Sequence, residues 1–430
     1  MAIMEFVETV IVGGGQAGLA MSYHLRRLGQ EHLVVERGRV GERWRTQRWD
    51  SLMFQFPNWS IELPGHRYAG AAPDAFSHKD EIVKLIEEYC ALIRAPLRTA
   101  VTVRSLRAAS QPNRYILVTD QGDIEARNVV IATGPHQRPR IPSLATPIRG
   151  KFLQIHASEY RNAAGLPSGA VLVVGTGASG CQIAEELLGA GRRVYLAVGQ
   201  HRRIPRRYRG RDVFWWRREL GHLDATAETT PRAQRMPAPL VTGVGGGHDI
   251  DLRQFAANGM TLLGHLRDIG ETRVRLALDL ADSLSRGDQV CDEFKRGVDE
   301  YVRETGLEAP RTQSDEKAGN IHDLEKPVEE LDLRAAGIGT VLWATGYQLD
   351  LGWVELPTFD ELGEPVHHRG VTPVPGIYFL GLRWLHKLKS SFLYGVGEDA
   401  EYLADRICAT NRGELPPTAS ATVLPRRLKD

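Results

Sequence analysis

Cysteine is scarce in this sequence: four occur among 430 residues, no two form a Cys-x-x-Cys pair, and none has a histidine nearby at metal-ligand spacing. A redox-active disulfide built from a closely spaced pair is therefore excluded. We interpret all four as free thiols, which suits the reducing cytoplasm. They are Cys90, Cys181, Cys291 and Cys408.

Excess charge of one sign and long apolar runs are lacking too. The chain carries 54 basic and 53 acidic residues, a formal net charge of +1. Such a balance does not draw a whole surface to nucleic acid or to an anionic membrane, so any basic site has to be local. No apolar run reaches the roughly 18 residues that a membrane-spanning helix needs. We expect a cytoplasmic protein that binds neither nucleic acid nor membrane.

The usual catalytic patterns of hydrolases are also missing. We find no Ser-His-Asp order, no His-Glu-x-x-His and no paired-carboxylate signature. Glycine, by contrast, is abundant at 44 residues, and glycine permits tight turns and a close approach of the backbone to a ligand. A chain of 430 residues is long enough for two domains.

The N-terminal segment has the pattern of a dinucleotide-binding unit. An apolar strand is predicted over 7–13, the segment GGGQAG follows at 13–18, and a helix is predicted over 16–28. A second strand, 32–35, then leads to Glu36, whose carboxylate can accept hydrogen bonds from a ribose diol.

The three glycines of this unit have different tasks. Gly13 permits the tight turn, Gly15 lets the backbone touch a pyrophosphate, and Gly18 lets helix and strand pack closely. The N-terminus of the helix adds free N–H groups and a partial positive charge for the phosphates.

A second copy of the unit follows, with a strand at 170–174, GTGASG at 175–180, a helix at 178–188 and a strand at 194–198. Sliding the first copy along the chain places its three glycines on Gly175, Gly177 and Gly180, and places Glu36 on Val198 without a gap. Two full units in register are hard to explain by composition alone.

The mismatch at Val198 predicts different nucleotides for the two copies. The second copy has no carboxylate there, and five arginines follow, namely Arg202, Arg203, Arg206, Arg207 and Arg209. Guanidinium groups can hold a 2′-phosphate that a carboxylate would repel. We infer FAD or an NAD-like adenosine nucleotide on the first unit and NADPH on the second. A solvated loop or a nucleic-acid patch is the alternative for the arginines.

Two further strands, predicted at 128–132 and 341–344, each end in Ala-Thr-Gly. Small residues at a strand end let the chain pass close beneath a dinucleotide and leave between domains. The predicted fold is therefore α/β, with two Rossmann-type domains: FAD-binding parts at 1–164 and 341–430, and an inserted NADPH domain at 165–340 with a helical or irregular insertion at about 212–330.

These features resemble the flavin-containing monooxygenase family, especially its bacterial and YUCCA-like branches, over nearly the whole chain. The resemblance adds GERWR at 41–45 and WDSL at 49–52 to the two fingerprints, and it matches the family's identifying motif in part through HASEY at 156–160. Gly150 does not stand at the family's spacing from His156, which could equally be a hinge residue bonded to backbone. The resemblance implies that Trp44 and Arg45 contact FAD.

The resemblance also implies the activity. NADPH would reduce the flavin, O₂ would give a C4a-hydroperoxyflavin, and one oxygen would pass to a small organic substrate. Tyr160 resembles the N- or S-oxygenating branch more than the Baeyer–Villiger branch, and an indole-3-pyruvate-like keto acid is a further expected substrate. A Baeyer–Villiger enzyme, a non-oxygenating NADPH:acceptor reductase and a nucleotide-binding redox sensor are the alternatives. The sequence leaves open whether the protein forms a homodimer.

The catalytic residues follow from the same alignment. In the family an asparagine near the flavin helps to hold the oxygenated flavin, and an ungapped match from Ser51 puts Gln55 there, with Asn58 nearby. The segment 390–395, ahead of a helix over 398–409, is expected to line the flavin, because a returning C-terminal segment caps the flavin in two-dinucleotide flavoproteins.

The full set of expected cofactor contacts draws on every motif above. It comprises Gly13, Gly15, Gln16, Ala17, Gly18, Glu36, Arg37, Trp44, Arg45, Val101, Ala132, Thr133, Gly134, Gly175, Gly177, Ala178, Ser179, Gly180, Arg202, Arg203, Ala344, Thr345, Gly346, Ser391 and Leu393.

Overall fold

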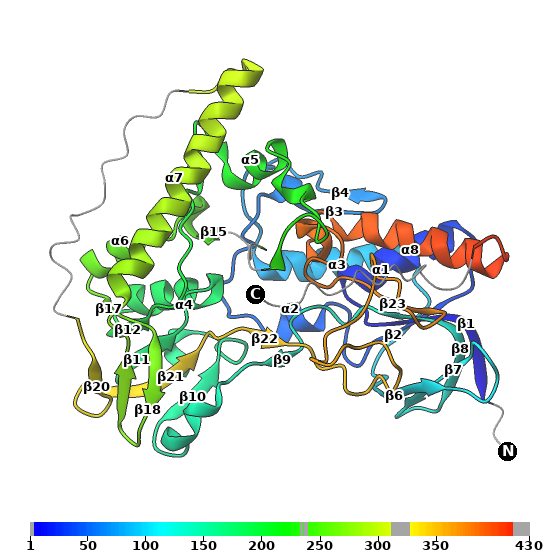
Figure 1. The fold of residues 1–430 in the computed structure, drawn as a ribbon, viewed down its shortest axis with the longest axis horizontal. Coiled ribbons are helices and arrows are strands. Elements are labelled where there is room, and N and C mark those ends of the chain that lie inside the picture. The colour runs from blue at the N-terminus through cyan, green and yellow to red at the C-terminus, as the bar shows by residue number, and fades with distance from the viewer. Residues whose placement is uncertain (1–3, 233–234, 236–239, 311–326, 416–430) are drawn as a thin grey trace, which may run out of the picture.

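Two sheets form the two halves of the protein, and helices cover both (Figure 1). The structure is a computed structural model, and it describes residues 4–232, 235, 240–310 and 327–415. In these residues no helix combines the length and the apolar character that a membrane crossing requires.

The first sheet is built around β1 (Glu5–Val12), whose apolar residues from Val7 onward are buried on both faces. β1 pairs in parallel with β2 and β8, so that Val10 lies opposite both Leu33 and Val129. The strand order is β5-β2-β1-β8-β7-β6, with β23 joined to β8. The other bounds are β2 (Leu33–Val35), β5 (Leu97–Arg98), β6 (Val103–Ala108), β7 (Tyr115–Thr119), β8 (Ile124–Ile131) and β23 (Ile377–Phe379).

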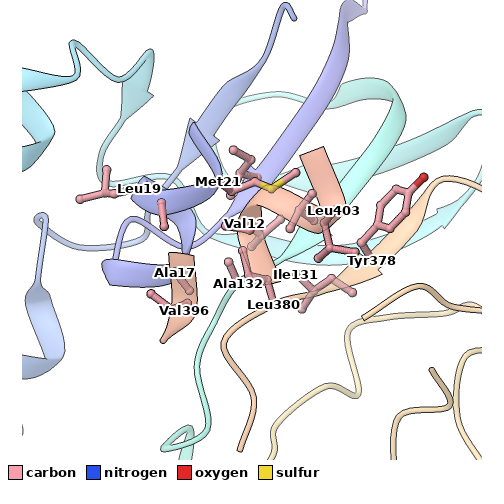
Figure 2. Close-up of a cluster of buried hydrophobic side chains, with 14 of the residues drawn as sticks. Val12, Ala17, Leu19, Met21, Ile131, Ala132, Tyr378, Leu380, Val396 and Leu403 are labelled. Carbon is pink, nitrogen blue, oxygen red and sulfur yellow. The ribbon is translucent and has the colours of Figure 1, made fainter. Parts of the chain in front are cut away.

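Helices α1 (Gln16–Arg27) and α8 (Val396–Asn411) pack together on this sheet, although they come from opposite ends of the chain. Figure 2 shows their apolar side chains, among them Met21 and Leu403, meeting residues of β1, β8 and β23. The expected helix ending at Gly29 is confirmed, since Gly29 has a φ of +67° directly after the C-cap.

The second sheet is parallel throughout, in the order β10-β21-β11-β12-β17. Its bounds are β10 (Leu153–His156), β11 (Ala170–Val174), β12 (Val194–Ala197), β17 (Thr261–Leu263) and β21 (Ile338–Trp343), with α4 (Ala178–Gly189) after β11. Three of these strands bear on the expected domain limits. β10 precedes residue 165, β21 runs across 340, and β17 lies inside the expected insertion, yet all three pair in this sheet.

The chain crosses between the sheets at two neighbouring places (Figure 1). β9 (Arg138–Pro139) follows the first Ala-Thr-Gly, β22 (Tyr347–Gln348) follows the second, and the two pair antiparallel. Each Ala-Thr-Gly therefore stands where the chain leaves a sheet for the crossing.

The described residues between 207 and 332 add further elements around the second sheet. They are β13 (Arg207–Tyr208), β14 (Arg211–Asp212), α5 (Val213–Glu219), β15 (Val241–Thr242), β16 (His248–Asp249), α6 (Leu252–Ala257), β18 (Leu266–Ile269), β19 (Arg273–Leu276), α7 (Leu280–Thr305) and β20 (Glu330–Asp332). Phe294 and Val298 of α7 pack against Trp216, which is fully buried and donates its indole N–H to Tyr208 O. These aromatic and apolar side chains form a core.

The remaining short elements lie next to the first sheet. They are α2 (Glu42–Thr46), α3 (Lys79–Leu92), β3 (Glu62–Leu63) and β4 (His66–Arg67). Helix α2, which carries most of the GERWR segment, packs on α3.

Candidate functional site

A single cavity of about 690 Å³ is lined by both glycine turns. Parts of nearly every expected motif reach it, from both sheets and from the C-terminal segment. The expected residues that line it are Gly13, Gly15, Gln16, Ala17, Glu36, Arg37, Trp44, Gln55, Val101, Ala132, Thr133, Gly134, Gly177, Ala178, Ser179, Ala344, Gly346, Ser391 and Leu393.

The central glycine of each turn has open space where a side chain would stand. A Cβ added to Gly15 or to Gly177 would meet no atom within 4 Å. Both residues are N-caps, of α1 and α4, with no side-chain cap, so the first N–H groups of each helix are free for an anion. The two turns therefore fit a pyrophosphate each.

The outer glycines of each turn serve packing. A Cβ on Gly18 would lie 1.9 Å from Gly13 O, and one on Gly180 would lie 2.1 Å from Gly175 O. Gly18, Gly175 and Gly180 consequently do not line the cavity, but they let the helix approach the strand closely enough to shape it.

Glu36 sits at the end of β2 and lines the cavity. Its carboxylate accepts hydrogen bonds from Gly14 N at 2.7 Å and from Gly38 N at 2.9 Å. The carboxylate therefore orders the glycine turn and remains beside the space where a ribose would lie.

The two Ala-Thr-Gly segments are held by side chains from the crossing. The Gln137 amide donates to Thr133 Oγ1 and to Gly134 O, and the His156 Nε2 bonds to Gly346 O at 2.9 Å. The His156 Nδ1 bonds to Ser158 Oγ, so both ring nitrogens are satisfied, and burial lowers the pKa of His156. His156 lines the cavity as a hydrogen-bonded residue of the crossing.

Thr345 and Arg45 do not line the cavity. The hydroxyl of Thr345 donates to Arg140 O, and the guanidinium of Arg45 pairs with Glu87 of α3.

The arginines after β12 point to other partners than expected. Arg203 pairs with Asp251 at 3.0 Å and with Asp288 at 3.4 Å, and neither Arg203 nor Arg202 lines the cavity. Arg206 is buried, and its guanidinium donates to the backbone carbonyl of Gln55.

Of the two expected catalytic residues, Gln55 and Asn58, only one reaches the cavity. Gln55 lines the cavity, whereas Asn58 is buried outside it and donates from its amide to Ala72 O at 3.1 Å. The wall near Gln55 is aromatic, and the ring of Phe56 contacts the rings of both Phe54 and Phe392.

The C-terminal segment closes this part of the cavity. The Gln16 amide donates to Ser391 O at 2.8 Å, which ties the first glycine turn to the segment ahead of α8. Leu393 is buried and lines the cavity together with Ser391.

A group of cationic side chains lining the cavity was not expected from the sequence. Arg43, Arg48 and Arg383 surround His136, and the Arg383 Nη2 donates to His136 Nε2 at 2.8 Å. Burial, together with these positive charges, holds the pKa of His136 well below its usual value, and burial with neighbouring arginines lowers the pKa of Arg43 to about 10. The only sequence signal was that His136 and Arg383 each follow a strand of the first sheet at its carboxyl end.

Comparisons with known proteins point to oxidoreductases that bind dinucleotides. A family model described as pyridine nucleotide-disulphide oxidoreductase matches residues 10–211. An uncharacterized CzcO-like oxidoreductase of Geobacillus kaustophilus is 32% identical over 408 residues, which cover 94% of this chain and 99% of that protein. An indole-3-pyruvate monooxygenase of the YUCCA group from Oryza sativa is 28% identical over 46% of this chain and 48% of its own.

Among solved structures, a flavin-containing monooxygenase from Stenotrophomonas maltophilia superposes with a TM-score of 0.63 at 18% sequence identity. The match covers 95% of this chain and 100% of that one, so the two share a fold.

The two sheets, the paired glycine turns and the cavity between them define an oxidoreductase with two dinucleotide-binding units, and its fold is that of the flavin-containing monooxygenases. Within that class, the chain belongs to the family of CzcO-like oxidoreductases. The expected fold class and the expectation of an enzyme are confirmed, and FAD and NADPH are the cofactors that the class uses.

Proposed function

We propose that the protein is a monooxygenase that uses FAD, NADPH and O₂ to oxygenate a small organic substrate. The observation that carries the proposal is that one cavity exposes both phosphate cradles, Gly15 and Gly177. Two dinucleotides held in one cavity can exchange a hydride without either leaving the protein.

Bound FAD would supply the redox chemistry, with NADPH as the reductant and O₂ as the source of the transferred oxygen atom. The residues of the chain would bind the two cofactors and orient them. Gly15, Gln16 and Glu36 would hold FAD, and Gly177 with Ser179 would hold NADPH. The returning segment at Ser391 would cover the flavin ring and keep water from it.

The aromatic wall supports an apolar substrate. Phe54, Phe56 and Phe392 face the same cavity as Gln55, and Gln55 can donate from its amide toward the reacting centre. We include N- and S-oxygenation and oxidation of an aromatic keto acid in the proposal. The rice relative, whose name gives indole-3-pyruvate as its substrate, supports the last of these.

A reductase that works through its own cysteines is not supported by the cavity. All four cysteines lie in the described part of the chain, none lines the cavity, and three are buried. Reduction of an outside acceptor by the flavin alone is the competing outcome of the test below.

The test uses the purified holoprotein with NADPH and ¹⁸O₂ and a panel of amines, sulfides, ketones and indole-3-pyruvate. We expect at least one compound to gain a single ¹⁸O atom, with one NADPH consumed for each product. Recovery of all electrons as hydrogen peroxide across the panel, or as a reduced quinone or metal, would replace the monooxygenase by a reductase.

A further inference from the structure

Arg206 is an arginine that the sequence pattern associated with a 2′-phosphate, but it is 1% exposed. It lies between β12 and β13, on the side of the second sheet. Its guanidinium stands over the ring of Phe76, 4.0 Å from the ring centroid. A charged side chain buried to this degree needs fixed partners to offset its lost hydration.

Three partners hold Arg206 in place. Its Nη1 donates to the backbone carbonyl of Gln55 at 2.6 Å, and its Nε lies 2.8 Å from Asp212 Oδ2. Its own backbone N–H donates to Asp249 Oδ1 at 2.5 Å. Arg206 thus joins Asp212 and Asp249 to the loop that carries Gln55 into the cavity.

The glycine-rich segment 243–247 packs against Phe54 of this loop and against Phe76. A Cβ on Gly243 would lie 2.6 Å from Phe54 O, and one on Gly247 would lie 2.5 Å from the ring of Phe76. The loop carrying Phe54 and Gln55 is therefore clamped from the side of the second sheet by a buried guanidinium and by close backbone packing.

We propose that Arg206 is a positioning residue that fixes the Gln55 side chain in the cavity by holding the Gln55 carbonyl. The proposal rests on the proposed function, because it takes Gln55 to act beside the bound flavin. Arginine suits the task because its planar fork can bind a carbonyl with one nitrogen and a carboxylate with another. A lysine ammonium could pair with Asp212 but offers no such fork.

The test compares Arg206→Met, Arg206→Lys and Gln55→Ala with the double variant R206M/Q55A. The measurements are the visible circular dichroism of the bound flavin and kcat and KM for NADPH oxidation in air. We expect Arg206→Met to alter the flavin spectrum and to lower kcat by roughly 10- to 100-fold, while KM for NADPH changes by less than about 2-fold. The double variant should be no worse than Gln55→Ala alone.

Controls separate positioning from folding. Arg211→Met changes an exposed arginine of the same hairpin that stacks on Trp215, and it should leave both readouts unchanged. The double variant R206M/D212N removes both charges, so that no unpaired carboxylate is buried if Arg206→Met alone fails to fold. Arg206→Lys, which keeps a cation beside Asp212, should have a melting temperature close to that of the unchanged protein, but it should not recover the flavin spectrum.

Additive effects in the Arg206/Gln55 cycle would overturn the proposal, as would full recovery of kcat and spectrum in Arg206→Lys. These readouts need only bound flavin and NADPH. If no compound gains oxygen in the ¹⁸O₂ experiment, the monooxygenase proposal fails while the Arg206 cycle can still succeed or fail.

Discussion

Gly15 and Gly18 stand three positions apart and are needed for different reasons. A side chain at Gly15 would enter open space, whereas one at Gly18 would collide with Gly13 O at 1.9 Å. Gly15→Val should therefore give a folded protein that lacks FAD, because the branched side chain would occupy the space of the pyrophosphate.

Gly18→Ala should instead destabilise the fold, by about 1–3 kcal/mol or more, because helix α1 has to move away from β1. The ratio of flavin to protein absorbance and the melting temperature together distinguish the two effects. A yellow Gly15→Val protein would contradict the assignment of the first cradle.

Arg202 and Arg203 were expected to act together on NADPH, but their surroundings differ. The Arg202 side chain has no ion pair or hydrogen bond within the described residues, whereas Arg203 pairs with Asp251 and Asp288. Arg202→Ala should raise KM for NADPH roughly 10-fold or more and leave KM for NADH unchanged.

Arg203→Ala should mainly lower the melting temperature, because it leaves the largely buried Asp251 without its cation. Both variants are measured by steady-state kinetics with NADPH and with NADH, and by thermal melts. If Arg202→Ala weakens NADPH and NADH alike, Arg202 does not bind the 2′-phosphate.

At the scale of the element, helix α8 carries a buried acid in its first turn. Asp399 is 2% exposed, and burial raises its pKa to about 6 despite a hydrogen bond from Ser390 and the positive charges of Arg369 and Lys387. The Asp399 carboxyl therefore binds its proton more tightly in the folded protein than in the unfolded chain. As a consequence, the free energy of unfolding falls as pH rises from about 4 to about 6.

Asp399→Asn should remove this pH dependence and stabilise the protein above about pH 6, by on the order of 2–3 kcal/mol. Thermal melts from about pH 4 to pH 8 measure it. An unchanged slope in the variant would show that Asp399 is not the group that titrates.

At the scale of the whole molecule, the cavity lies between the two sheets and is lined by residues of both. A ligand that binds only the folded state stabilises it, by about 2.7 kcal/mol at a concentration 100 times its dissociation constant. Removing FAD should therefore lower the melting temperature, and adding FAD back should restore it. Gly15→Val, unable to bind FAD, should show no response.

Most of the fold could be predicted because the signals are local. The strand at 170–174 and the start of its helix at Ala178 match the structure, and so does the start of the first helix at Gln16. Both units use a strand, a glycine turn and a helix that are contiguous in sequence, so each residue's neighbours along the chain determine its conformation. The expected domain limits stay a prediction, because strand pairing such as that of β10 with β21 joins segments far apart in the chain and no local signal marks it.

The candidate site could be predicted where it consists of motifs, and not where it depends on long-range packing. Gln55 was expected near the flavin and lines the cavity, but nothing local indicated that Arg206, 151 positions away, binds its backbone carbonyl. The same limit applies to Arg383 and His136, which meet across 247 positions of sequence.

By itself, the sequence determined the class of this protein: two dinucleotide cradles, one followed by an acid and one not, because glycine spacing and strand–turn–helix order are local properties. The tertiary structure alone decided which charged side chains face the cavity and which are buried or paired elsewhere. That choice depends on the electrostatic cost of burial and on partners brought together by folding, so that Arg206 became a buried clamp while Arg43, Arg48 and Arg383 line the cavity.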